Sequence, residues 1–215
     1  MKKLLLTMLT LGFTLSNSFA LEYSVGATGN VGKYSPSGTE TINSATPVST
    51  SEDIYAPYAS IFGEVHLNDN LRLGLSYVPY ALESETRENA RTSTTPAVSN
   101  GTNNVQVDVE NLASAYISLY HDTGAFVKAG IIQGDLKTNE SLYTGSSYGD
   151  ADLEGYIVGG GFEKNLNDGI FVRAEINYSE FDDITLNSTG SDNSNKIEVK
   201  NLDGITGALS IGKTF

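Results

Sequence analysis

The chain of 215 residues lacks cysteine altogether, and it has only 13 lysines and arginines against 26 aspartates and glutamates. Without cysteine the protein has neither a disulfide framework nor a thiol that could carry a lipid anchor after a leader. The shortage of basic residues argues against nucleic acid as a partner, because phosphate binding needs clusters of lysine and arginine. Long apolar runs are missing too. Beyond residue 20 nothing approaches the ~20 apolar residues that a membrane-spanning helix requires.

The first 20 residues carry the three parts of a secretory signal peptide. Lys2 and Lys3 precede an apolar run from Leu4 to about Leu15, and the segment ends on the small residues of Ser18-Phe19-Ala20. The sequence therefore predicts a leader at 1–20 and a single mature domain at 21–215. Without the two leader lysines, 11 basic residues face 26 acidic ones, so the mature chain has a net charge of −15.

Hydrophobic residues make up 39% of the chain, which is low for a soluble core of this size. The alternating arrangement of the hydrophobic residues accounts for this low content. In the segment 170–178, Ile170, Val172, Ala174 and Ile176 alternate with polar or large residues, the period-two pattern of a strand that has one apolar face. A short Asn/Asp/Gly turn at 165–169 joins it to the segment 155–164, and together they predict a β-hairpin.

The same alternation recurs along the chain. It predicts further strands at about 21–32, 54–67, 71–82, 105–120 and 125–137, and a last strand that ends at Phe215. Long polar connections at 34–53, 83–104, 138–150 and 182–195 alternate with short turns at 68–70, 121–124 and 165–169. A soluble barrel has no reason to gather its long loops at one end, whereas a bacterial membrane barrel has short periplasmic turns and long outer loops. The prediction is an all-β, eight-stranded antiparallel up-and-down transmembrane barrel.

A resemblance agrees with this fold. Gly161-x-Glu163, a short turn and then Arg173-x-Glu175 followed by an aromatic resemble the signature hairpin of small outer-membrane β-barrels. That group includes the OmpA transmembrane domain and the opacity proteins. The resemblance spans residues 21–215 and implies a place in the cell outer membrane, with outer-membrane lipid and lipopolysaccharide as surroundings. A chain that ends in Phe215 resembles the signal read by the barrel-assembly machinery, although Lys213 stands where an aromatic is usual.

Aromatic residues fall at both ends of the predicted outer face. The outer-loop end has Tyr55, Tyr77, Tyr156 and Tyr178, and the turn end has Tyr23, Phe162 and Phe215. Such rings are typical of the two interfaces of a membrane barrel.

Charged residues fall on the predicted inner face. They are Glu64, Arg72, Lys128, Glu163, Arg173 and Glu175, accompanied by the large residues Tyr58, Phe62, Tyr80, Tyr116, Phe126 and Ile132. Charges in a narrow barrel must be paired, because unpaired burial is costly. The resemblance implies that Glu163 and Arg173 take part in an internal salt-bridge network. Filling of the lumen is the favoured interpretation of these residues, and a gate is the alternative.

Other motifs have simpler interpretations. The segment 207–214 spells a phosphate-binding loop, but the helix that such a loop requires does not follow it. The run Gly159-Gly160-Gly161 predicts a strand without bulk where neighbouring groups approach closely. Acidic residues in the long connections match no dedicated calcium loop, so we expect a solvated surface and no metal or cofactor.

The chain has few histidines that could serve in acid–base catalysis. His66 and His121 are the only histidines, and both lie beside short turns on the periplasmic side. The sequence therefore predicts a non-enzymatic barrel with a structural or surface-exposed role, such as membrane integrity, adhesion or recognition of an extracellular ligand. A small pore for ions or small solutes is the alternative, and a lipid-modifying enzyme comes third.

Overall fold

The computed structural model describes residues 21–41, 48–51, 53–91, 101–142, 146–190 and 195–215. The predicted leader at 1–20 lies outside these residues and stays a prediction. No helix in the described part of the chain is long and apolar enough to cross a membrane.

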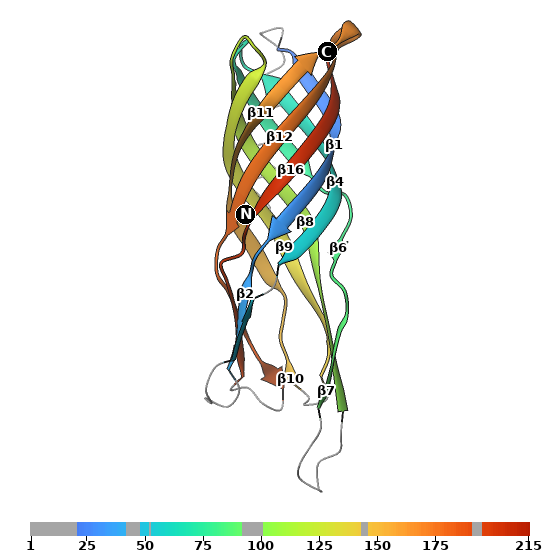
Figure 1. The fold of residues 1–215 in the computed structure, drawn as a ribbon, viewed down its shortest axis with the longest axis vertical. Coiled ribbons are helices and arrows are strands. Elements are labelled where there is room, and N and C mark those ends of the chain that lie inside the picture. The colour runs from blue at the N-terminus through green and yellow to red at the C-terminus, as the bar shows by residue number, and fades with distance from the viewer. Residues whose placement is uncertain (1–20, 42–47, 52, 92–100, 143–145, 191–194) are drawn as a thin grey trace, which may run out of the picture.

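A closed ring of antiparallel strands forms the body of the molecule, as predicted (Figure 1). Each strand pairs with the next in the chain, and the last pairs with the first, which removes the exposed edges of an open sheet. The eight members are β1 (Tyr23–Tyr34), β4 (Ile54–His66), β5 (Leu71–Tyr77), β8 (Gly101–Tyr120), β9 (Ala125–Ser141), β11 (Ala151–Asn165), β12 (Ile170–Phe181) and β16 (Asp203–Thr214).

The outer face of this ring is apolar and exposed. Leu209 is 71% exposed, Ile176 67% and Val127 60%, while the residues between them on the same strands point inward. An apolar band of this extent fits lipid and not water. The predicted aromatic residues flank the band, with Tyr55 and Tyr156 exposed at the loop end and Phe162 and Phe215 exposed at the turn end. The alternation in the sequence therefore assigned the two faces correctly over most of the barrel.

The third strand is interrupted, which corrects the prediction of one continuous strand over 71–82. β5 ends at Tyr77, and the segment resumes only as β6 (Leu82–Glu83) and β7 (Arg87–Arg91), both paired with β8. Pro79 lies in the gap and has no N–H for a ladder. The prediction that Tyr80 fills the lumen is wrong, because its side chain is 46% exposed. Its hydroxyl instead accepts a hydrogen bond from the Ala59 N–H of β4 at 2.6 Å.

A bulge in β8 corrects a second prediction. The register shifts between Glu110 and Ala113, and Asn111 adopts a φ of 52°. Because one extra residue exchanges the two faces of a strand, Val107 and Val109 pack inward against buried apolar residues. The sequence alone had assigned both valines to the lipid side.

The long connections extend the barrel outward as folded structure, where the sequence predicted polar loops. At the end opposite the short turns, β2 (Ser37–Thr41), β3 (Val48–Ser51), β13 (Ile184–Asn187) and β15 (Lys196–Lys200) form a four-stranded sheet (Figure 1). β10 (Ser146–Ser147) pairs with β14 (Thr189–Gly190) nearby. A buried apolar cluster holds this region together, built from Leu136, Tyr148, Leu153, Ile184 and Leu186. At the opposite end, the 3-10 turn η2 (Asn167–Gly169) joins β11 to β12.

Candidate functional site

The lumen is the candidate site, because it gathers the six predicted interior charges. Glu64 comes from β4, Arg72 from β5, Lys128 from β9, Glu163 from β11, and Arg173 and Glu175 from β12. All six side chains are at most 10% exposed, whereas the residues beside them on each strand face outward. Alternation along five different strands therefore brings them into one interior.

Arg173 lies at the centre of this group. Its Nη1 and Nη2 donate to Glu64 Oε1 and Oε2, both at 2.8 Å, and Nη2 also donates to Glu163 Oε2 at 2.8 Å. Such forked contacts are charge-assisted and geometrically specific. The guanidinium carbon also lies 5.1 to 5.3 Å from the ring centroids of Phe62, Phe126 and Phe171, which suits a cation over aromatic faces.

Arg72 completes the network from the neighbouring side. Its two terminal nitrogens donate to the two carboxylate oxygens of Glu163 at 3.0 Å each, and Nη1 lies 3.5 Å from Glu64. The two arginines thus share both carboxylates. Every charge therefore faces an opposite one, although the Arg72 Nε–H has no hydrogen-bond partner among the described residues.

Several aromatic residues support the network and were missed or undervalued at the sequence level. The hydroxyl of Tyr116 donates to Glu64 at 2.9 Å and that of Tyr120 donates to Glu163 at 3.2 Å. The ring of Tyr120 also lies 3.8 Å from the Arg72 guanidinium carbon. Phe171 is 0% exposed beneath Arg173. The signal for Tyr120 and Phe171 was the same alternation that assigned Tyr116 and Arg173 to the lumen.

A second ion pair lies next to this network, on the side of the long connections. Lys128 Nζ contacts Glu175 Oε2 at 2.5 Å, and the ammonium lies 4.9 Å from the ring centroid of Tyr116. Arg173 Nη1 is 4.0 Å from Glu175 Oε1, so the two groups of charges nearly touch.

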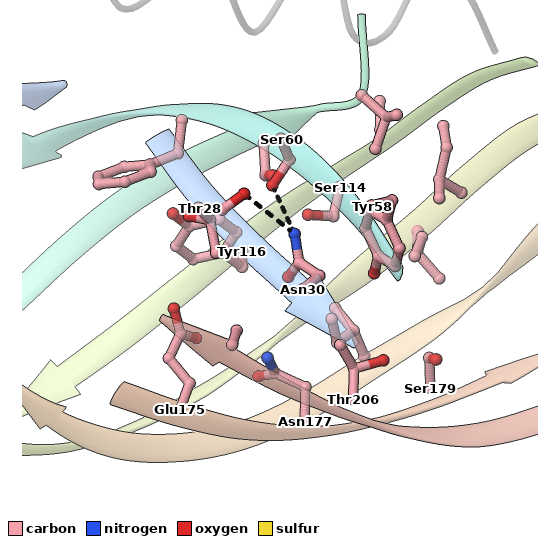
Figure 2. A pocket seen from close by; sticks show the side chains of 18 of the residues that line it. Thr28, Asn30, Tyr58, Ser60, Ser114, Tyr116, Glu175, Asn177, Ser179 and Thr206 are labelled. Carbon is pink, nitrogen blue, oxygen red and sulfur yellow. Dashed lines mark hydrogen bonds between the residues drawn. The ribbon is translucent and has the colours of Figure 1, made fainter. Parts of the chain in front are cut away.

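Lys128 and Glu175 are among the residues that line a polar chamber of about 60 Å³ in the lumen (Figure 2). Hydroxyl and amide groups line it, among them Thr28, Asn30, Ser60, Ser114, Asn177, Ser179 and Thr206. Asn30 Nδ2 donates to Ser60 Oγ at 3.2 Å, and Thr28 Oγ1 bonds Ser210 Oγ at 2.8 Å. At ~10–15 Å³ of cavity volume per water, the chamber has room for about four to six waters.

Apolar residues line the chamber toward the loop end. Val78, Leu112 and Ile132 are buried together, with Tyr58 and Phe181 packed against them. Leu112 follows the bulge at Asn111 and points inward together with Ser114 and Tyr116, at every second residue. The larger cluster around Leu153 lies beyond them in the outer extension.

The histidines lie at the periplasmic end, as the sequence placed them. His66 Nε2 is 2.8 Å from Ser24 Oγ, which also bonds Thr214 Oγ1 at 2.8 Å, and Glu22 lies 3.5 Å from His66 Nδ1. Ser24 is 0% exposed, so this chain of hydrogen bonds joins β1, β4 and β16 and presents no accessible nucleophile. His121 bonds Thr123 within its own turn. Among the described residues no group of three or more histidine, aspartate or glutamate side chains could hold a metal ion.

Comparison with known proteins identifies the fold. No protein-family model matches the sequence, and no curated protein matches it. The outer membrane protein OprG from Pseudomonas aeruginosa is 12% identical, with 90% of this chain and 95% of OprG covered and a TM-score of 0.63. The outer membrane protein AlkL is 14% identical, with 90% of each chain covered and a TM-score of 0.49. Ail of Yersinia pestis is 13% identical, with 88% and 99% covered and a TM-score of 0.42. The likeness to OprG, together with the exposed apolar band, establishes the fold as that of a small outer-membrane β-barrel.

Proposed function

We propose that this outer-membrane β-barrel is a closed, non-catalytic protein that reinforces the membrane and presents a folded cap at the cell surface. The observation that carries the proposal is the filling of the lumen. The network of Arg72, Arg173, Glu64 and Glu163 fills the periplasmic half, and the buried apolar residues Val78, Leu112 and Ile132 line the chamber toward the loop end.

The size of the barrel supports this role. An eight-stranded barrel is just wide enough for its own side chains to fill, and here paired charges and aromatic rings occupy the interior. A chamber of about 60 Å³ is smaller than a pocket for a drug-sized ligand, which needs ~300 Å³ or more. The outer extension, with its own apolar cluster, gives the surface a defined shape for contact with the surroundings.

A small pore is the competing proposal, and the polar chamber favours it. Water in the chamber would be separated from the periplasm by the charge network and the aromatic rings packed against it. Proteoliposome swelling in arabinose separates the two roles. We expect no swelling above that of empty liposomes, under conditions where a trimeric porin swells rapidly. Swelling by this protein would contradict closure.

A membrane test addresses the reinforcing role. Cells that lack the protein should take up more of the apolar dye 1-N-phenylnaphthylamine, and wild-type protein should restore the barrier. A variant with Leu153→Asp and Leu186→Asp, which places two charges in the apolar cluster of the cap, should reach the membrane but present an altered surface. If cells without the protein behave like wild type, the reinforcing role is wrong.

A further inference from the structure

Two lysines form no ion pair with any side chain that the structure describes. Lys164 and Lys213 have no carboxylate within 4.0 Å among the described residues, although the chain is rich in acid. Seven other lysines and arginines are paired. Lys33 pairs with Asp53, Lys128 with Glu175, Lys137 with Asp150, Lys196 and Lys200 with Glu198, and Arg72 and Arg173 with the lumen carboxylates.

The two lysines share one face of the barrel. Lys164 lies opposite Val172 near the end of β11, and Lys213 lies opposite Ile170 near the end of β16. β12 runs between them, and the three strands lie side by side in Figure 1. With ~4.8 Å between strands and ~3.4 Å per residue, the two Cα atoms are about 12 Å apart. Two extended lysine side chains can therefore reach one headgroup.

Both side chains point toward lipid. Lys213 alternates with Ile211 and is in register with Val25, which is 52% exposed. Lys164 alternates with Phe162, which is 50% exposed. The Lys213 ammonium lies 5.3 Å from the ring centroid of Phe215, at the aromatic girdle of the turn end. Long lysine stems lie along apolar surface and carry their charge to the headgroup level.

The turn end carries four acidic residues of its own, Glu22, Asp69, Asp122 and Asp168, but most acidic residues outside the lumen lie toward the loop end. Near the loop end, Asp135 is in register with both Glu110 and Asp152, and Glu180 is in register with Asp203. This acidic rim lies beyond an apolar band that is ~25 Å tall in such barrels, several times the ~8 Å Debye length at physiological salt. An anion at Lys164 and Lys213 is therefore screened from most of the protein's negative charge.

We propose that Lys164 and Lys213 bind the phosphate of an anionic phospholipid in the periplasmic leaflet, with Phe162 and Phe215 bordering its acyl chains. The site gives Lys213 a role where an aromatic residue is usual. It rests on the orientation of the barrel, with the short turns toward the periplasm, and it does not depend on whether the lumen is closed.

Native mass spectrometry tests the proposal on the mature protein. The folded barrel is released from mixed micelles that hold equal amounts of dioleoyl phosphatidylglycerol and dioleoyl phosphatidylcholine, which differ only in the headgroup. We expect preferential retention of phosphatidylglycerol. Each of Lys164→Gln and Lys213→Gln should lower that preference about fivefold, which corresponds to the ~1 kcal/mol that a lysine near an anionic surface contributes. The double variant should show no preference.

Matched variants keep the test decisive. Lys33→Gln removes an outward lysine that is paired with Asp53 at the other rim, and it should leave the preference unchanged. Lys164→Arg with Lys213→Arg retains both charges and should keep it. A gel-mobility shift on heating confirms that each variant is folded before it is measured. Equal retention of the two lipids by the wild type, or an undiminished preference in the double Gln variant, would overturn the proposal.

Discussion

Arg173 and Glu64 form a forked ion pair across the lumen, with Nη1–Oε1 and Nη2–Oε2 both at 2.8 Å, although 109 positions separate them in the chain. The same Arg173 also holds Glu163, which Arg72 holds from the other side. Loss of Arg173 therefore deprives Glu64 of its principal partner, whereas Glu163 keeps the fork of Arg72.

Gly161→Ala should impair folding of the barrel. A Cβ at this position would lie 2.0 Å from the backbone oxygen of Ala174 on β12, and a backbone atom in a closed ladder cannot move aside. We expect destabilisation of ~1–3 kcal/mol in urea titrations followed by the heat-modifiable band. Gly29→Ala is the control, since a Cβ there meets nothing within 4 Å. Equal stability of the two variants would contradict the packing described for β11.

Tyr80→Phe should loosen the backbone of β4 at Ala59, where the third strand is interrupted. The Ala59 N–H loses its acceptor, which costs ~1–3 kcal/mol locally where water cannot replace it. Hydrogen exchange at the Ala59 amide should accelerate by about tenfold or more, with global stability little changed. Tyr77→Phe, at the exposed end of β5, supplies the control. An unaltered rate at Ala59 would mean that the amide has another acceptor.

The faces of the barrel were predictable because a strand repeats every two residues. That rule assigned Phe62, Tyr116, Phe126 and Ile132 to the interior, and all four are buried. It failed where a local feature breaks the repeat. Asn111 at a positive φ inserts one residue into β8, and Pro79 ends the pairing of β5, so Val107, Val109 and Tyr80 all face the side opposite to the predicted one.

The outer cap was not predictable from composition. Ile184, Leu186 and Leu153 are single apolar residues scattered among polar ones, and they meet in one buried cluster where the strands extend outward beyond the barrel. The sequence could not predict either which interior charges pair with one another. Alternation shows that a charge points inward, but the height at which each strand presents it depends on the stagger of the barrel.

Protease added to intact cells tests the orientation. Segments 84–91, 101–104 and 184–190 belong to the outer extension, so cleavage should occur there and elsewhere in the long connections. The turns at 68–70, 121–124 and 165–169 should be cut only after the cells are opened. Cleavage confined to opened cells would contradict the assigned orientation.

The double variant Leu153→Asp with Leu186→Asp should increase cutting near 139–142 and 184–187, because it breaks up the apolar cluster that holds those segments.

Asp150 should titrate as a paired carboxyl. The Lys137 ammonium, at 2.6 Å, and the Thr138 N–H lower the pKa of Asp150 below its ordinary value of 3.8. Because the folded pKa is depressed, the contact stabilises this segment above the ordinary pKa and the contribution is lost as the pH falls through the lowered value. In a carboxyl-carbon NMR titration the midpoint should lie below 3.8 and rise toward it in Lys137→Met. An identical midpoint in that variant would remove Lys137 as the cause.

Planar-bilayer recording tests the closed lumen most directly. The refolded wild type should show no large steady conductance, because Arg72, Arg173, Glu64 and Glu163 fill the periplasmic half of the barrel. Arg173→Ala leaves Glu64 without its forked partner, at a cost of up to ~3–5 kcal/mol before water relieves it, and should conduct more readily. Val127→Ala, on the lipid face of β9, should record as wild type. Large, long-lived openings in the wild type, or an Arg173→Ala trace identical to wild type, would contradict closure by this network.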